Sequence, residues 1–150
     1  ELILDQYAYL ASDEGGADAQ ARAQLETLRA QVALAESPGL SRATPASELP
    51  LGVPAAYWLD LRTYDPLATA RDLPIPLFFS QGGRDYQVPP SELAAWREAL
   101  AHRTDVAFHE YTALNHLLMA GSGPSTPAEY TQPGHVAPEV VADLAAWILE

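Results

Sequence analysis

Two short β-type segments, each followed by a loop with an ionisable residue, constrain this sequence more than any other feature. The first is a continuous apolar run at residues 75–80, and Asp85 follows it. The second is the β-type run at 106–111, which places Val106, Phe108 and Glu110 on one face and Ala107, His109 and Tyr111 on the other, and His116 follows it. A continuous apolar run is typical of a buried parallel strand, and a helical pattern at 91–102 separates the two segments. Together they predict a right-handed βαβ unit in which Asp85 and His116 follow the carboxyl ends of neighbouring parallel strands.

Helical patterns dominate the rest of the sequence. Residues 1–60 contain no convincing strand, and the Pro- and Gly-rich residues 37–54 predict irregular, extended chain. A Gly-, Ser- and Pro-rich loop is predicted at 120–137. Helices are predicted at 2–10, from a cap at Asp18 after a Gly15-Gly16 break to about residue 35, at 55–61, as a single turn at 66–71, and from Pro138 onward. We therefore expect a helical segment at 1–60 and an α/β region at 61–150.

Composition excludes several classes of partner and chemistry. The formal net charge of −12 disfavours nucleic acid and anionic membranes as partners, and no apolar stretch approaches the roughly 20 residues of a membrane span. Lys and Cys are absent, which excludes Schiff-base chemistry, disulfides, thiolate nucleophiles and Cys-ligated metals. No metal or cofactor is expected. The sequence shows no signal-peptide pattern and begins with Glu1, so we expect a cytoplasmic location and a truncated or processed chain.

Asp85 and His116 are the residue types that a serine hydrolase needs beside its nucleophile. A histidine takes the proton of the serine hydroxyl, and a carboxylate orients the imidazole and stabilises its charged form. In α/β-hydrolases these residues follow the order Ser, then Asp or Glu, then His along the chain. Asp85 precedes His116, as that order requires. The two side chains are therefore predicted to form a hydrogen bond of about 2.6–3.2 Å.

At these residues the sequence resembles the C-terminal half of an α/β-hydrolase of the serine esterase, dienelactone hydrolase and peptidase kind, over residues 64–150. The residues that carry the resemblance are Asp65-Pro66, Pro74-Ile75-Pro76, Gln81-Gly82-Gly83-Arg84-Asp85-Tyr86-Gln87-Val88 and Tyr111-Thr112-Ala113-Leu114-Asn115-His116, with similarity to a subset of these hydrolases at Pro127-Ala128-Glu129-Tyr130 and Pro133-Gly134-His135-Val136. The resemblance implies that Asp85 and His116 are catalytic and follow the seventh and eighth strands. It also implies that residues 1–60 are a helical cap segment and residues 61–150 the C-terminal β-α-β-α part of the hydrolase core.

The family's nucleophile, the serine of a Gly-x-Ser-x-Gly pentapeptide, has no counterpart in this sequence. Ser122 lies between two glycines at the wrong spacing, and Ser125 lies in a segment that lacks the second Gly and follows no strand. Both serines follow His116, contrary to the family order. We therefore expect a truncated serine hydrolase that is inactive alone. The complete protein would act on an ester, thioester or amide, with a small-molecule ester or a peptide-like compound as substrate.

The alternative is a non-catalytic folded remnant or an assembly module. Asp85 can simply cap a turn or the following helix, and His116 can be a structural loop residue. Two parallel strands also leave an apolar edge or face, expected here around Phe78, Phe79 and Phe108. The chain is therefore expected to pair with itself as a homo-oligomer or with a missing N-terminal half.

The remaining histidines give no metal-ligating pattern. His102 is expected at a helix end and His109 on a strand, and neither clusters with carboxylates at the spacing of metal ligands. His135 is expected to be exposed to solvent in a loop. Arg84 is expected at the surface or in an ion pair.

Overall fold

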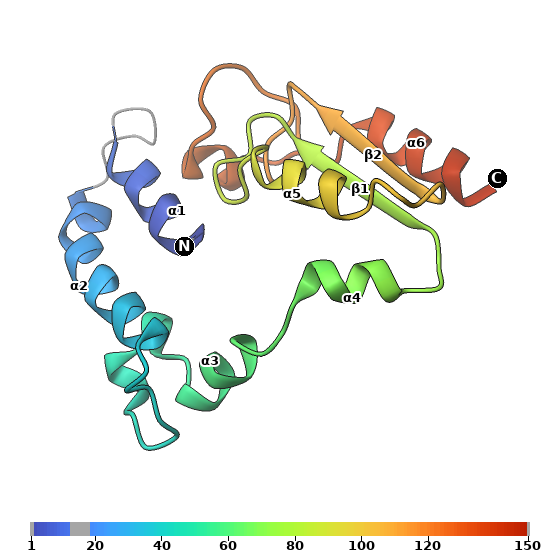
Figure 1. Ribbon diagram of the computed structural model, residues 1–150. Coiled ribbons are helices and arrows are strands. Elements are labelled where there is room, and N and C mark those ends of the chain that lie inside the picture. Colours follow the sequence, from blue (N-terminus) through green and yellow to red (C-terminus); the bar gives the residue numbers. More distant parts are fainter. Residues whose placement is uncertain (1, 13–18, 150) are drawn as a thin grey trace.

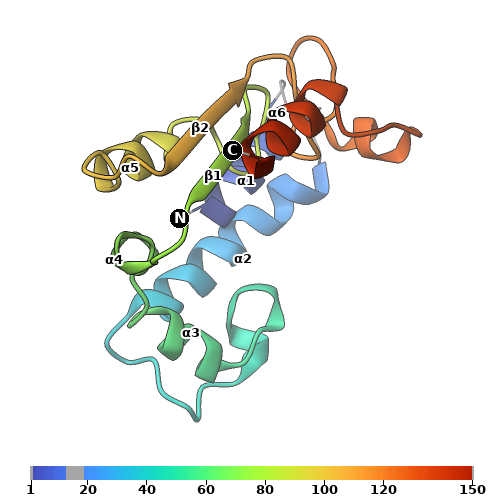
Figure 2. The ribbon, with the colours of Figure 1, turned by 90° about the vertical axis from the view of Figure 1, so that its right-hand side faces the viewer.

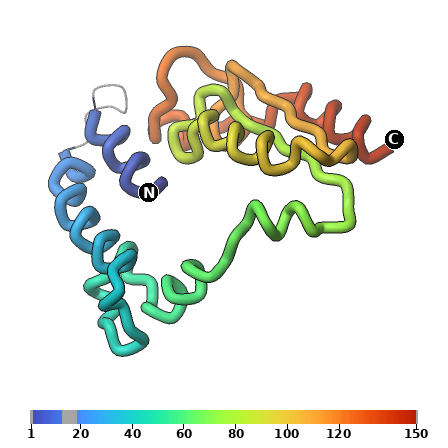
Figure 3. The backbone as a smooth tube through the Cα atoms, in the orientation of Figure 1, coloured from blue at the N-terminus to red at the C-terminus, as the bar shows by residue number. Residues whose placement is uncertain are grey.

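The computed structural model of the chain describes residues 2–12 and 19–149. In chain order its elements are α1 (Leu2–Ala11), α2 (Ala19–Glu36), the 3₁₀ turns η1 (Ala46–Glu48) and η2 (Pro50–Gly52), α3 (Ala55–Leu61), α4 (Pro66–Asp72), β1 (Leu77–Gly82), α5 (Glu92–Ala99), β2 (Val106–Tyr111), the 3₁₀ turn η3 (Pro127–Thr131) and α6 (Pro138–Leu149). Figure 1 and Figure 3 show α2, α3 and α4 following one another in an arc, whereas the strands, α5 and α6 form an α/β unit. The fold is mixed α/β, as expected.

The N-terminal helices follow the predicted apolar pattern. On α2, Leu28, Val32 and Ala35 are buried at helical spacing, and α1 packs against this helix. Ala35 also contributes to a core cluster with Leu40, Leu49 and Ala55, which joins α2 to the start of α3. The irregular segment 37–54 is confirmed, interrupted by the turns η1 and η2. The Gly15-Gly16 break and the cap at Asp18 lie outside the described residues.

The α/β unit contains the predicted pair of parallel strands. β1 pairs with β2 from Leu77 opposite Val106 to Gly82 opposite Tyr111, and α5 forms the connection between them. The second strand was predicted at its observed bounds. The first strand begins and ends two residues later than predicted, because Pro76 has no N–H for the ladder whereas Gln81 and Gly82 continue the pairing. The helix predicted at 91–102 ends at Ala99, where Leu100 leaves the helical conformation.

Helices cover both faces of the two-stranded sheet. On one face, Leu77 and Phe79 of β1 and Val106 and Phe108 of β2 pack in a cluster with residues of α4 and α5. On the other face, α6 covers the sheet, as the perpendicular view in Figure 2 shows. The ring of Trp147 on α6 lies 5.5 Å from that of Phe78. Parallel strands require such two-sided cover, because both of their faces are apolar.

Because helices lie on both faces of the sheet, the exposed apolar face expected around three phenylalanines is not observed. Phe78, Phe79 and Phe108 are half-buried rather than exposed. The ring of Trp147 on α6 lies against Phe78 and that of Trp96 on α5 against Phe79, whereas Phe108 stacks on Phe79. Several large exposed apolar side chains of this half lie elsewhere, on α6, just before β1 and in loops. Among them are Ile75, Val141 and Ile148, with exposed fractions of 54%, 58% and 66%.

Arg103 fastens α4 to the amino end of the sheet. Its guanidinium donates to the carbonyl oxygens of Ala70, Leu73 and Ile75 at 2.6–2.9 Å and forms an ion pair with Asp105. Arg103 thereby pairs carbonyls in the last turn of α4 and in the segment that follows this helix. No helix in the described ranges is long and apolar enough to cross a membrane.

Candidate active site

The loops after β1 and β2 approach each other closely at a pair of glycines. Gly83 N–H donates to the Tyr111 carbonyl at 2.8 Å, and Arg84 N–H donates to the Leu114 carbonyl at 2.9 Å. A Cβ atom on Gly82 would lie 2.5 Å from the Asn115 carbonyl oxygen, which is closer than atoms can approach. The Gly-Gly pair is therefore required by the approach of two backbones, and it brings the loop of Asp85 against the loop of His116.

Asp85 and His116 form the predicted hydrogen bond. Asp85 Oδ2 lies 2.9 Å from His116 Nδ1, although the residues are 31 positions apart. The other oxygen, Oδ1, accepts hydrogen bonds from the backbone N–H groups of Gln87 and Val88, both at 2.9 Å. Asp85 thus caps the turn after β1 and also holds the imidazole. The turn-capping interpretation is correct for one oxygen of the carboxylate, whereas the other oxygen binds His116.

The Asp85 side chain is buried, whereas the His116 side chain is partly exposed and accessible to another group. The Asp85 side chain is 7% exposed and the His116 side chain 38%. A carboxylate accepts hydrogen bonds, so it favours the tautomer in which Nδ1 carries the proton. The tautomer leaves Nε2 as the nitrogen that can accept a proton from another group. An oriented imidazole of this kind is the general base of a serine hydrolase.

Asn115 shapes the turn that presents His116, and the sequence analysis missed its role. Its side chain is 1% exposed, and Oδ1 accepts from the backbone N–H groups of Leu117 and Met119 at 3.0 and 3.2 Å. Leu118 closes the turn in the left-handed region, with φ of 55°. Asn in a loop that follows a strand is a known signal for this kind of side-chain-to-backbone turn, and that signal is present in the sequence.

A partly buried carboxylate, that of Glu129 in η3, contacts both loops. It forms an ion pair with Arg84 and accepts from Asn115 Nδ2 at 2.9 Å and from Ser125 Oγ at 3.3 Å. Burial raises the pKa of Glu129, but the hydrogen bonds from Arg84 and Asn115 outweigh it, so the pKa lies below its ordinary value. Of the two places expected for Arg84, the ion pair is correct. The sequence gives no local signal for these contacts of Glu129, because Arg84 and Asn115 lie 45 and 14 residues away from it.

A tyrosine cluster brings α1 to the candidate site. The Tyr86 ring, next to Asp85, stacks at 4.8 Å on Tyr9 of α1 and at 6.2 Å on Tyr130. Tyr9 also donates its hydroxyl to the Ser125 carbonyl at 2.8 Å. Burial, together with the neighbouring Tyr130 and Tyr9, raises the pKa of Tyr86 to about 12. Tyr9, Asp85, Tyr86 and Ser125 line a pocket with a volume of about 440 Å³, so residues from both halves of the chain meet beside Asp85.

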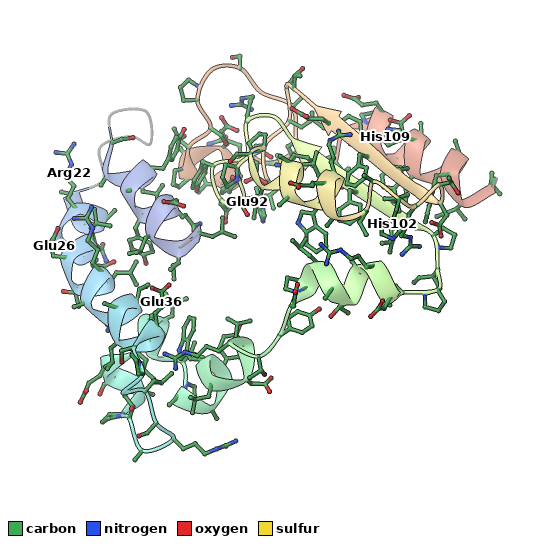
Figure 4. All side chains as sticks on the ribbon, viewed as in Figure 1. Arg22, Glu26, Glu36, Glu92, His102 and His109 are labelled. Atoms are coloured by element: carbon green, nitrogen blue, oxygen red, sulfur yellow. The ribbon has the colours of Figure 1, made fainter. Side chains whose placement is uncertain are left out.

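The remaining histidines lie away from this pair. Figure 4 labels His102 and His109 in the α/β unit. His109 Nδ1 lies 3.3 Å from Asp143 Oδ2 on α6, and Tyr111 donates to the same oxygen at 2.9 Å. This contact was not visible in the sequence, because α6 folds back over the strand. Within the described residues no group of three His, Asp or Glu side chains is placed to hold a metal ion. His135 is exposed in its loop, as predicted.

Comparison with known proteins gives one informative match. No protein-family model and no solved structure matches the chain. The Esterase EstD of Thermotoga maritima is 42% identical over 106 residues, which cover 71% of this chain and 26% of EstD. The chain thus spans about a quarter of the length of this curated relative. The match and the parallel α/β architecture agree with the resemblance drawn from the residues around Asp85 and His116. By this match the chain is similar to part of an esterase, in agreement with the resemblance to the α/β-hydrolases.

Proposed function

We propose that this chain supplies the acid and the base of a serine hydrolase. The observation that supports the proposal best is the 2.9 Å hydrogen bond between Asp85 and His116, placed after two adjacent parallel strands. The nucleophile would come from a segment outside these 150 residues, because the sequence contains no Gly-x-Ser-x-Gly. The match to EstD favours an ester as the substrate, with thioesters and amides as the related classes.

The proposed mechanism assigns one role to each residue. Asp85 holds Nδ1 of His116 and stabilises the imidazolium that forms during the reaction. His116 Nε2 takes the proton from the serine hydroxyl as the hydroxyl oxygen attacks the ester carbonyl. The same nitrogen then gives this proton to the departing alkoxide. Water, activated by the same imidazole, hydrolyses the acyl-enzyme and restores the serine.

The N-terminal helices would form part of the cap over this site. Tyr9 of α1 stacks on Tyr86, and Gln6 Nε2 donates to Gln87 Oε1 at 3.1 Å. Both contacts are made with residues that directly follow Asp85. A segment in this place can restrict which acyl or alcohol groups reach His116. Residues 1–60 as a cap segment and residues 61–150 as the core are therefore part of the proposal, as is a cytoplasmic location.

An assembly module is the second candidate function, and two observations favour it. Within the described residues the sheet has two strands, so each strand has an edge without a strand partner. The exposed Val141 and Ile148 on α6 add apolar surface. Unpaired edges and such surface invite association with a second copy of the chain or with a complementary segment. In the hydrolase proposal the complementary segment is the one that carries the serine.

The test is a chimera in which this chain replaces the matched region of EstD. The isolated chain is expected to show neither hydrolysis of p-nitrophenyl esters nor labelling of a serine by a fluorophosphonate. The folded chimera is expected to show both, and His116→Ala should lower its kcat by several orders of magnitude. His135→Ala is the matched control, since His135 is an exposed loop histidine.

Two outcomes contradict the proposal. A folded, active chimera that keeps its full activity after His116→Ala would show that His116 is not its base. Stoichiometric labelling of a serine in the isolated chain, abolished by His116→Ala, would show that the chain contains its own nucleophile. Sedimentation of the isolated chain examines the assembly function separately, because a homo-oligomer without labelling or turnover is what that function requires.

A further inference from the structure

The residues that directly precede Asp85 and His116 meet at one carboxylate. Arg84 precedes Asp85, and its Nη2 pairs with Glu129 Oε1. Asn115 precedes His116, and its Nδ2 donates to Glu129 Oε2 at 2.9 Å. Each loop therefore carries one side chain that binds the opposite loop and one side chain that binds Glu129. The Arg84–Glu129–Asn115 bridge joins the same two loops as the Asp85–His116 hydrogen bond.

This bridge lies in a protected environment. The side chain of Arg84 is 9% exposed and that of Glu129 28%. Asn115 and Ser125 are 1% exposed. Charge-assisted hydrogen bonds are stronger and more directional in such surroundings than at an open surface. The bridge is therefore suited to fix the separation of the loops, which a single surface ion pair is not.

Arg84 also fixes the segment that carries Glu129. Its Nε donates to the Gly123 carbonyl at 2.7 Å, and its Nη2 donates to the Ser122 carbonyl at 3.3 Å. A Cβ atom on Gly121 would lie 2.0 Å from Arg84 Nη1, so only glycine leaves space for the guanidinium there. The segment between His116 and η3 thus contacts the Arg84 guanidinium at residues 121–123. Arg84 holds both the carboxylate and the chain that presents it.

We propose that Glu129 is a positioning residue that sets the Asp85–His116 geometry through Arg84 and Asn115. The catalytic part of this inference rests on the proposed function. Glu129 makes its hydrogen bonds with Arg84, Asn115 and Ser125 and with neither Asp85 nor His116, so it acts through its partners. His116 is partly exposed, and the backbone hydrogen bonds between the loops hold their main chains together without directing the two side chains. The bridge adds a side-chain connection between residues 84 and 115, as supporting hydrogen bonds do around other catalytic groups.

The first experiment observes the hydrogen bond itself in the isolated chain. The Nδ1–H proton of His116 is followed by NMR, with Asp85→Ala as the variant that removes its acceptor. Glu129→Gln keeps the size of the side chain but removes its charge. We expect this variant to remain folded and its His116 Nδ1–H to exchange with water roughly tenfold faster, because the bridge loses its charge-assisted bonds. Glu98→Gln on α5 is the control, since Glu98 is exposed, and it should leave the resonance unchanged.

The second experiment exchanges the amide and the carboxylate between residues 115 and 129. Asn115→Asp keeps an acceptor for Leu117 and Met119 but turns an oxygen toward Glu129, so it should disturb the His116 resonance at least as much as Glu129→Gln. Combining Asn115→Asp with Glu129→Gln places an amide donor opposite a carboxylate again. The double variant should recover the resonance of the unchanged chain. This recovery tests the geometry of the bridge even where Glu129→Gln alone does not fold.

The third readout uses the EstD chimera. Glu129→Gln should lower kcat by roughly 10- to 100-fold and leave KM within about twofold, because it misplaces the base without touching the substrate. If His116→Ala leaves the chimera active, the proposed function fails, and the NMR experiment still decides whether Glu129 positions the pair. If His116→Ala abolishes activity but Glu129→Gln changes neither kcat nor the His116 resonance, the inference about Glu129 alone is wrong. Absence of recovery in the folded double variant would also overturn it.

Discussion

Asp85 reaches His116 with only one of its carboxylate oxygens: Oδ2 lies 2.9 Å from the imidazole Nδ1. Oδ1 is occupied by the backbone N–H groups of Gln87 and Val88. The two oxygens of this buried carboxylate therefore have separate tasks, one in the turn and one toward the imidazole. Substitutions at residue 85 can separate these tasks.

Asp85→Asn should leave the fold nearly unchanged, whereas Asp85→Ala should destabilise it. The amide oxygen of Asn can still accept from Gln87 and Val88, but its NH₂ group would face His116 and favour the tautomer with the proton on Nε2. Ala removes the acceptor and leaves N–H groups unpaired, at a cost of roughly 1–3 kcal/mol. Urea unfolding measures the stability, and ¹⁵N NMR of the imidazole reports the tautomer. Equal stability of the two variants would contradict the task assigned to Oδ1.

Gly82→Ala should be strongly destabilising. A Cβ atom there would lie 2.5 Å from the Asn115 carbonyl and 2.6 Å from that of Leu114, so the loops of Asp85 and His116 would have to separate. We expect a loss of about 3 kcal/mol in urea unfolding and a loss of the Asp85–His116 hydrogen bond. Gly39→Ala is the matched control, because its Cβ would lie 3.5 Å from the nearest atom, Ser37 Oγ. A Gly82→Ala chain as stable as the control would contradict the close approach.

Glu129 should make the chain sensitive to acid. Its pKa in the folded chain lies below the ordinary 4.5, because the hydrogen bonds from Arg84 and Asn115 overcome the effect of burial. A lowered folded pKa contributes stability above about pH 4.5, and that contribution is lost as the pH falls through the folded pKa. Glu129→Gln should therefore unfold with a weaker pH dependence below pH 4.5 than the unchanged chain. Urea midpoints measured from pH 6 downward give the comparison, and identical slopes would be inconsistent with an ionised, bridged Glu129.

Tyr86 should contribute to unfolding in alkali. Burial, followed by the neighbouring tyrosines and Asp85, raises its pKa from 10.0 to about 12. A raised folded pKa gives stability that is complete below pH 10 and is lost as the pH rises toward 12. The pKa of Tyr111 is also raised to about 12, by burial and by its hydrogen bond to Asp143. Tyr86→Phe should therefore reduce the loss of stability between pH 10 and 12, and adding Tyr111→Phe should reduce it further, as urea unfolding across this range can show.

The parts of the fold that could be predicted are those with a local pattern. The strand at 106–111 and the helix at 55–61 were predicted at their observed bounds, because side-chain periodicity reports which face of an element is buried. The predicted bounds of the first strand were two residues too early, because a continuous apolar run gives no sharp limits. The parallel pairing followed from the order of strand, helix and strand.

The candidate site was predicted only in part, for a related reason. Asp85 and His116 could be named because each lies in the loop after a strand, and parallel strands end at the same edge of a sheet. Glu129 could not be found in the same way. It lies in a Pro- and Gly-rich loop without periodicity, so nothing local indicates that its carboxylate turns toward Arg84, 45 residues earlier.

The sequence by itself determined the α/β class of this chain, its parallel strand pair and the identity of the two residues at their ends. These follow from local patterns and from chain order. Only the tertiary structure decided that the Gly82 loop closes against the Asn115 loop, that Glu129 bridges Arg84 and Asn115, and that α1 brings Tyr9 to Tyr86. Such contacts depend on the path of loops between distant residues. That path is set by close packing and by satisfying buried polar groups, which are properties of the whole folded chain.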